Sequence, residues 1–437
     1  MLSPCSTSTK ALFNCVVIIG YVWPEPNSSA AGSRMMQLIN FFKKNTQRIV
    51  FASPAQHSIH REDLPALGVE EHSITLNCDS FDLWLNDISP DAVIFDRFMM
   101  EEQFGWRVEQ QCPDCIRILN TEDLHSLRSA RELRLKKAIK AGDDFDHNFD
   151  DFSALYQTMA QTDICQREIA AIMRSDLSIM ISSFEIAFLK EIFKVPEHIL
   201  MHLPFMLENS SSDSKQLSFD DREHFVTIGN FRHQPNWDCV RYLKMTLWPL
   251  IRKALPQAQL HIYGAYPAKK VTDLHNPKQG FYIQGWAENA HQVLANAKVC
   301  LAPIRFGAGI KGKFTDAMQT ATPIVTTPVG SEAMHQNYEW PGAEHFESQA
   351  LADSAVALFT DEQQWQAASD KGQIIINQLY NKDKLEAHLQ HTIFALKNNL
   401  QQSRLDNFSG LMLRHHHHKS TQYMSQWIAA KNSHSVN

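Results

Sequence analysis

Short apolar runs alternate with longer amphipathic stretches over most of this chain. The apolar runs have the length of strands and are rich in valine and isoleucine; they cover residues 13–21, 48–52, 91–95, 116–120, 177–181, 225–228, 260–263, 281–283, 299–304 and 324–327. Within them apolar and polar positions alternate little, which is typical of parallel strands buried on both faces. Stretches that suit helices cover residues 35–42, 127–141, 164–173, 237–255, 289–297 and 310–320. Strands that alternate with helices predict an α/β fold with parallel sheets.

A polar break divides this pattern into two halves. Residues 208–221, ENSSSDSKQLSFDD, contain only two large apolar residues, as linkers do. We therefore expect a first domain over residues 1–207, a linker over 208–222, a second domain over 223–395 and a helical tail over 396–437. Two α/β halves of comparable size, each with a glycine loop, predict a cleft between them.

A glycine-rich turn in the second half, RFGAG, carries the clearest chemistry. Gly307 and Gly309 let the backbone approach a ligand closely, because no Cβ stands in the way. The helix that follows directs its free N–H groups and the positive end of its dipole to the same place, and Lys311 adds a full positive charge. This pattern indicates a phosphate-binding turn. The alternative is a tight connection with Lys311 in solvent, and the spacing alone leaves both readings open.

The first half repeats the plan of strand, glycine loop and helix. Its loop, WPEPNSSAAGSR, places Ala31 and Gly32 near a cleft, since ligands of such sheets bind at the carboxyl ends of strands; a plain connection is the alternative. Asp96, Glu122 and His125 follow two further strands. These side chains are candidates for acid–base or hydrogen-bonding work. In the alternative reading, residues at these strand ends serve only as helix caps.

Composition and charge exclude several classes of protein. A net charge of −7 provides no basic face for nucleic acid. The longest apolar run near the start, residues 15–22, is too short to span a bilayer and lacks the cleavage site of a signal peptide, so we expect a cytoplasmic protein. Eight scattered cysteines form no disulfide framework, and the carboxylates of residues 142–151 match no calcium loop. The four histidines at 415–418 resemble a purification tag, and we expect no metal site.

Three stretches of the second half carry a resemblance to a known family. They are GNFRHQPNWDCVRYLKMTLWPLIRKALPQAQLHIYG at 229–264, YIQGW at 282–286, and APIRFGAGIKGKFTDAMQTATPIVTTPVGSEAM at 302–334. This half resembles the donor-binding domain of glycosyltransferase family 4, the group 1 type, and the match covers about half of the chain. The first half resembles the family's acceptor domain in layout only. The resemblance implies a GT-B fold, in which two Rossmann-like domains face each other across a cleft.

The resemblance also implies a role for each matching residue. Lys311 and Arg232 would hold the diphosphate of a nucleotide sugar while its glycosidic bond breaks. Asp316 takes the place of a family glutamate that binds ribose hydroxyls, and a surface ion pair with Lys313 is its alternative. The other donor-binding positions are Gly307 and Gly309 beside the sugar and phosphates, Gln284, Gly285 and Trp286 against the base, Gly330, Ser331 and Glu332 near the ribose or diphosphate, and Ala31 and Gly32 on the opposite wall.

The chain departs from the family pattern at one carboxylate. Ala308 stands eight residues before Asp316, where the family has the first glutamate of a spaced pair. In many members an arginine and a lysine follow the first strand of this domain; here Asn230 and Pro235 stand there, and Arg232 is the nearby cation. The missing carboxylate keeps a second reading open, a non-catalytic scaffold that binds nucleotide sugars. A sugar-nucleotide epimerase, with the same layout, is a third.

The preferred reading is an enzyme of glycan biosynthesis. It would move a hexosyl residue from a UDP- or GDP-sugar to a glycan, a lipid-linked saccharide or a protein, with retention of anomeric configuration. It would need no metal or cofactor, because cationic side chains and a helix dipole would stabilise the leaving diphosphate. Asp96, Glu122 or His125 would orient the acceptor. Peripheral association with the inner face of a membrane is a further expectation, whereas the sequence does not set the oligomeric state.

Overall fold

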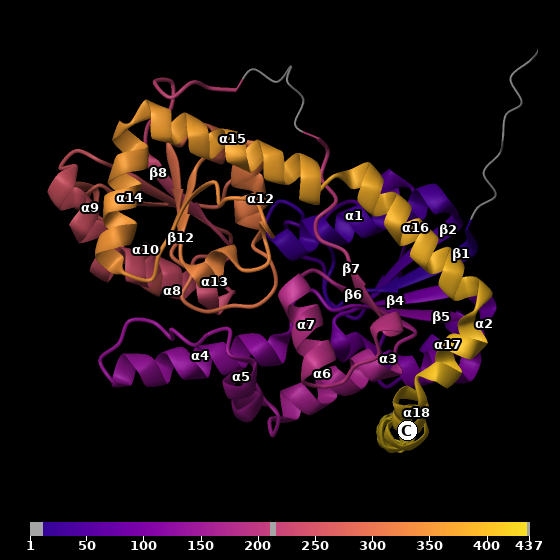
Figure 1. Cartoon of the computed structure of the whole chain (residues 1–437). Helices are drawn as coiled ribbons and strands as arrows, with labels where there is room; N and C mark the ends of the chain where they lie inside the picture. The colour runs from indigo at the N-terminus through magenta and orange to yellow at the C-terminus, as the bar shows by residue number, and fades with distance from the viewer. Residues whose placement is uncertain (1–11, 210–215, 435–437) are drawn as a thin grey trace, which may run out of the picture.

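The computed structural model describes residues 12–209 and 216–434. It contains two parallel sheets, one in each half of the chain (Figure 1). The first sheet has the strand order β3-β2-β1-β4-β5-β6-β7 and the second the order β10-β9-β8-β11-β12-β13. The strands are β1 (Phe13–Ile19), β2 (Thr46–Ser53), β3 (Glu70–Ser73), β4 (Ala92–Asp96), β5 (Ile116–Asn120), β6 (Leu177–Met180), β7 (Leu200–His202), β8 (Phe225–Ile228), β9 (Leu260–Tyr263), β10 (Phe281–Gly285), β11 (Val299–Leu301), β12 (Ile324–Thr326) and β13 (Gly342–Glu344).

Helices connect the strands and cover both faces of the sheets. In the first half they are α1 (Ala30–Asn45), α2 (Ser80–Ile88), α3 (Phe98–Gln111), α4 (His125–Lys140), α5 (Phe152–Met159), α6 (Asp163–Arg174) and α7 (Ser183–Glu191). The second half has α8 (Gln234–Tyr242), α9 (Trp248–Ala254), α10 (Lys269–Thr272), α11 (Ala290–Ala295), α12 (Gly312–Gln319), α13 (Pro328–Ser331), α14 (Ser348–Thr360) and α15 (Glu362–Leu379). The chain continues with α16 (Lys382–Asn398), α17 (Leu400–Asp406) and α18 (Phe408–His434).

The side chains of β1 alternate between two hydrophobic cores. Val17 and Ile19 belong to the core beneath α3, whereas Val16 and Ile18 belong to the core beneath α1. Because successive side chains of a strand point to opposite faces, a strand buried on both faces must be apolar at every position. This is why the run reads as continuously apolar, and the predicted parallel α/β fold is confirmed.

Two predicted helices differ most from those in the structure. The helix expected over residues 237–255 is interrupted between α8 and α9 by a π-helical turn over Leu243–Leu247. Pro249 explains the interruption, because a proline has no N–H for the normal helical bond to the preceding turn. The helix expected from residue 35 instead begins at Ala30, where the Ser29 hydroxyl accepts a hydrogen bond from the N–H of Gly32.

The segment after Asn381 returns to the first half of the molecule. Helix α16 runs along the first half of the molecule (Figure 1). Its residues Leu389, Ile393 and Leu396 are buried in the core beneath α1. Residues 382–395, which we expected within the second domain, thus pack against the first. The exact division of the chain into domains stays a prediction. No helix in the described residues is long and apolar enough to cross a membrane.

Candidate active site

A cavity of about 1380 Å³ lies between the two halves. Its walls come from the carboxyl ends of both sheets, at the strands β1 and β8 where each sheet order reverses, which is the usual ligand position in such folds. The predicted residues that line it are Ala31, Gly32, Asp96, Glu122, His125, Arg232, Trp286, Gly307, Gly309, Lys311 and Asp316. The predicted residues Gln284, Gly285, Gly330, Ser331 and Glu332 do not line it.

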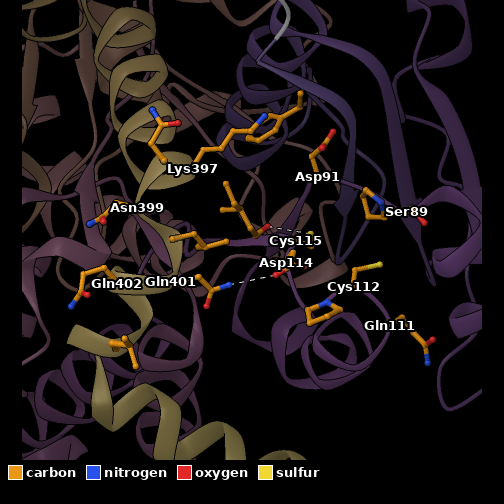
Figure 2. A pocket seen from close by; sticks show the side chains of 17 residues that line it. Ser89, Asp91, Gln111, Cys112, Asp114, Cys115, Lys397, Asn399, Gln401 and Gln402 are labelled. Carbon is orange, nitrogen blue, oxygen red and sulfur yellow. Dashed lines mark hydrogen bonds between the residues drawn. The ribbon is translucent and has the colours of Figure 1, made fainter.

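A second cavity, of about 780 Å³, lies between the first sheet and the segment that joins α16 to α17 (Figure 2). Several of its polar groups form hydrogen bonds that hold the fold. Asp91 accepts the N–H groups of Asn14 and Cys15, Lys397 donates to the carbonyl of Leu12, and Gln401 donates to Asp114. The cleft between the halves is therefore the candidate active site.

The N-termini of α1 and α12 meet at the cleft. A Cβ on Gly312 would lie 2.5 Å from the Cβ of Ala30, so only a glycine allows this approach. No described side chain caps α12, because its N-cap residue Lys311 makes no capping hydrogen bond. Each helix start carries about half a positive charge from its dipole, and the first turn of α12 also has N–H groups that no side chain caps. The two helix starts together form a positive region that suits an anion.

Lys311 is half-buried at this point, and its Nζ donates a hydrogen bond of 2.8 Å to the carbonyl of Gly309. Burial lowers the pKa of Lys311 to about 8; the charge of Glu332 opposes the shift and that of Arg131 adds to it. Arg232 also lines the cleft, with its guanidinium stacked over the ring of Tyr266 at 3.6 Å. Two predicted cations of the second half therefore face one cavity.

Side chains of the first half hold the glycine turn from the other side. Arg131 of α4 donates a hydrogen bond of 2.9 Å to the carbonyl of Gly307 and forms a buried ion pair with Glu332. The N–H of Gly309 donates to Glu185 of α7 at 2.8 Å. Gly309 has a φ of 63°, and a Cβ there would lie 3.0 Å from the Cβ of Asp123, so this position needs a glycine.

Neither Arg131 nor Glu185 was among the predicted site residues. Arg131 lies in the stretch 127–141, which was predicted only as a helix, and Glu185 lies where the sequence predicts the start of the next helix. Both side chains are almost fully buried. Burial raises the pKa of Glu185 to about 8, with the charge of Asp123 adding to the shift and the N–H groups of Leu124 and Gly309 opposing it. A buried carboxyl group thus faces the turn in which Ala308 stands where the resemblance implies a glutamate.

Asp316 interacts with a histidine, and the alternative considered for it, an ion pair with a lysine, is not formed. His291 Nε2 lies 3.5 Å from Asp316 Oδ1, and this contact raises the pKa of His291 against the effect of burial. Lys313 donates to Asn236 at 2.7 Å, so the ion pair that we considered between Asp316 and Lys313 is not formed. Both Asp316 and His291 line the cleft.

Asp96 and Glu122 form a buried acidic pair on the first-half wall. The amide of Asn120 contacts both side chains, at 3.4 Å from Asp96 and 2.7 Å from Glu122. Burial raises the pKa of both carboxyls, and the charge of Arg34 opposes the shift. Arg97 and Glu122 have φ values of 71° and 62°, in the left-handed region that non-glycine residues rarely adopt. Such strain gathers at functional sites.

His125 stands beside a second acidic residue of this wall. Its Nε2 lies 3.6 Å from Asp123 Oδ1, and Arg128 forms an ion pair with the same carboxylate. Burial lowers the pKa of His125 to about 4, against the charge of Asp123, so its imidazole is neutral at pH 7. The N–H groups of His125 and Ser126 donate hydrogen bonds to Glu168, so Glu168 caps α4. The alternative reading, in which residues at this strand end cap the helix, is therefore wrong for α4.

Trp286 lies across the cleft from a first-half loop. Its ring stacks on His60 with 4.7 Å between centroids, and its Nε1 donates to the carbonyl of Asn27 at 2.9 Å. The side chain is 41% exposed, so one part of the ring still faces open space. Tyr266 contacts the same loop region through hydrogen bonds to Glu25. The aromatic residues of the second half thus form part of the contact between the halves.

Comparison with known proteins identifies one part of the chain by sequence. Residues 222–361 match the sequence model of the family described as Glycosyl transferases group 1. This segment runs from β8 to α14 and contains the glycine turn, Lys311 and Asp316. No curated protein matches the chain.

Solved structures share the fold. Sucrose-phosphate synthase from Thermosynechococcus elongatus is 15% identical, with a TM-score of 0.61 over 88% of this chain and 99% of that one. Anabaena Alr3699/HepE, in complex with UDP and glucose, is 12% identical, with a TM-score of 0.61 over 86% and 98%. TarM of S. aureus, a mutant in complex with UDP, is 14% identical, with a TM-score of 0.53 over 71% of this chain and 58% of its own length. These likenesses show the GT-B fold, and this chain spans little more than half the length of TarM.

Proposed function

We propose that this chain, with its group 1 domain on a GT-B fold, is a glycosyltransferase that moves a hexosyl residue from a nucleoside-diphosphate sugar to a hydroxyl acceptor. A UDP- or GDP-sugar is the donor. UDP-glucose is the first donor to test, because HepE is seen with it bound. The acceptor is a glycan, a lipid-linked saccharide or a protein.

The convergence of α1, α12, Lys311 and Arg232 on one cavity carries this proposal. A nucleoside diphosphate gains negative charge as the bond between the sugar carbon and the phosphate oxygen breaks. Fixed cations and helix N-termini stabilise that charge without any rearrangement at the moment of reaction. The same groups would do the work of a metal ion, so we propose a reaction that needs no metal or cofactor.

The first-half wall supplies the acceptor side of the reaction. The acceptor oxygen bonds to the sugar carbon as the phosphate oxygen leaves, and the acceptor proton passes to the departing phosphate. Attack on the face that the phosphate leaves retains the anomeric configuration and needs no protein nucleophile. Asp96, Glu122 and the neutral His125 line the cleft, where they can accept or donate hydrogen bonds to a sugar hydroxyl.

Replacing Lys311 tests the donor site. We expect Lys311→Ala to weaken binding of UDP or of the matching nucleotide about ten- to a hundredfold, the cost of losing a charge-assisted hydrogen bond, and to slow turnover while the melting temperature changes little. Calorimetric titration with UDP-, GDP- and ADP-sugars measures the affinity. Lys253→Ala, an exposed lysine on α9, is the matched control and should bind as the unchanged protein does.

Ala308 favours a second candidate, a non-catalytic nucleotide-sugar binder, because the family carboxylate is absent there. The two candidates differ in turnover. A donor that binds tightly and yet is neither transferred nor hydrolysed with any acceptor from a cell extract would support the binder. If no nucleotide sugar binds the unchanged protein at all, both candidates are wrong.

A further inference from the structure

The surface of α18 carries exposed apolar side chains near both ends of the helix, with exposed polar residues between them, where it lies against the first half. Phe408, Met412, Tyr423, Met424 and Trp427 are each at least 50% exposed. Phe408 and Met412 lie four residues apart, as do Tyr423 and Trp427, so each pair occupies adjacent turns on one side of a helix. Isolated exposed apolar residues are ordinary, whereas a group of five on one helix marks an interaction surface.

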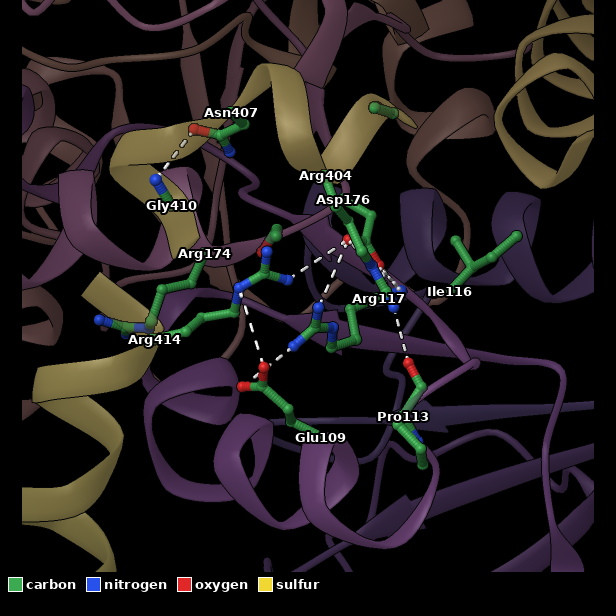
Figure 3. Close-up of polar contacts among 12 residues, drawn as sticks. Glu109, Pro113, Ile116, Arg117, Arg174, Asp176, Arg404, Asn407, Gly410 and Arg414 are labelled. Atoms are coloured by element: carbon green, nitrogen blue, oxygen red, sulfur yellow. Dashed lines mark hydrogen bonds and ion pairs between the residues drawn. The ribbon is translucent and has the colours of Figure 1, made fainter. Parts of the chain in front are cut away.

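The opposite face of α18 is fixed to the protein by polar contacts. Arg404, just before the helix, forms two hydrogen bonds to Asp176 (Figure 3). Arg414 lies beside the same carboxylate, at 3.7 Å. A Cβ on Gly410 would lie 2.2 Å from the carbonyl of Met173, so the helix backbone touches the end of α6.

A second anchor holds the helix near its other end. Ser425 accepts a hydrogen bond from Arg107 of α3 and donates one to Asn77. The helix thus cannot rotate to bury its outward face without breaking both sets of contacts. The aromatic side chains are held outward by the fold.

The charge of this segment differs from that of the rest of the chain. Residues 407–437 contain Arg414, Lys419 and Lys431 and no aspartate or glutamate, in a chain whose net charge is −7. Lys419 and Lys431 are exposed beside the apolar side chains. Tryptophan and tyrosine, with an apolar ring and a polar tip, suit the boundary between lipid headgroups and acyl chains. A second copy of the helix would bring like charges together.

We propose that the outward face of α18 docks on an anionic lipid bilayer, with Phe408 and Trp427 inserted at the headgroup level and Lys419 and Lys431 contacting anionic headgroups. This inference does not depend on the donor or the acceptor. It places the first half of the enzyme against the surface. The lysines add electrostatic attraction to the apolar burial, which alone binds weakly and reversibly.

Cosedimentation of the full chain with vesicles tests the proposal. One set of vesicles contains phosphatidylcholine alone and the other contains phosphatidylcholine with phosphatidylglycerol. We expect the protein to bind the second set about tenfold more strongly, and added salt to reduce this difference. Absent binding to both sets, or equal binding to both, overturns the proposal.

Variants identify the surface. The double variant Phe408→Ser with Trp427→Ser should lower vesicle partitioning about tenfold, whereas Met245→Ser, an exposed methionine of the second half, should not. Nucleotide affinity measured in solution shows that each variant is folded, and it separates a failure here from a failure of the donor site. If the unchanged protein is a dimer that the double variant makes monomeric, without any change in vesicle binding, the face binds a second copy and the proposal is wrong.

Discussion

Lys311 combines two opposing requirements in one side chain. Burial in the cleft strengthens its attraction to an anion, because the local dielectric constant is low. The same burial lowers its pKa to about 8, which brings its loss of charge close to neutral pH. A bound diphosphate would restore the charged form, so binding of the donor and uptake of a proton are linked at this residue.

This linkage predicts how nucleotide affinity depends on pH. Below pH 8 Lys311 is already charged and affinity should be flat; above it, affinity should fall by up to about tenfold per pH unit, because binding must then take up a proton. Calorimetry in two buffers of different ionisation enthalpy measures that proton directly. Lys311→Arg keeps the charge at all these pH values, and proton uptake in this variant would contradict the assignment to Lys311.

At the scale of elements, buried strands were predictable and polar edges were not. The strands β1, β4 and β5 are short, apolar at most positions and almost wholly buried, so their sequence reports their burial directly. The edge strands β3, EEHS, and β13, GAE, contain no apolar run, because few of their side chains meet a core. Their pairing depends on backbone hydrogen bonds to a neighbour, which leave no signature in the sequence.

The residues of the candidate site also fall into two groups, those that the sequence predicted and those that it did not. Lys311 was predicted from its glycine turn, whereas Arg232 and Asp316 were implied by the family resemblance, and the structure places all three on one cavity. Arg131 and Glu185 were not predicted as site residues, because their roles depend on contacts between residues more than 100 positions apart in the sequence. Periodicity and local motifs carry no information on such pairs. Only the packing of α4 and α7 against the glycine turn shows them.

The ion pair between α4 and the segment after β12 leads to an element-scale prediction. Arg131→Met should leave Glu332 and the carbonyl of Gly307 without their partner, so stability should fall by about 3–5 kcal/mol and nucleotide affinity should decrease. Urea unfolding of Arg131→Met, Glu332→Gln and the double variant gives the coupling energy. We expect about 0.5–3 kcal/mol.

Arg134 provides a control on the same helix. It forms an ion pair with Asp146, entirely within the first half. Arg134→Met should therefore leave nucleotide affinity unchanged. An equal loss of affinity in the two arginine variants would show that α4 acts on the fold in general and has no specific hold on the glycine turn.

At the scale of the whole molecule, buried carboxyls between the halves link stability to pH. The pKa of Glu185 is about 8 in the folded protein, raised above the value near 4.3 of an unfolded chain. The protonated side chain of Glu185 favours the folded state. This contribution to the free energy of unfolding is complete at pH values below the pKa of the unfolded chain and is lost as the pH rises. The free energy of unfolding should therefore fall by about 1.4 kcal/mol per pH unit up to pH 8. The loss should level off above that pH.

Glu185→Gln tests this slope, since it keeps an oxygen that can accept from Gly309 and removes the ionisation. From pH 5 to 8 the variant should gain stability relative to the unchanged protein, measured by thermal or urea unfolding. Glu191→Gln, an exposed glutamate of the same helix, should follow the unchanged protein at each pH. Parallel pH curves for Glu185→Gln and the unchanged protein would show that another group sets the slope.

The return of α16 has a consequence for how the protein is made. The second half, with its own sheet and core, is complete in sequence by residue 380, whereas the first core still lacks Leu389, Ile393 and Leu396 at that stage. Synthesis runs from the N-terminus, and domains usually fold in that order. In this protein the two hydrophobic cores are completed in the opposite order. The second half emerges later from the ribosome, but its core can be completed first. The half that emerges earlier must wait for the rest of the chain to return.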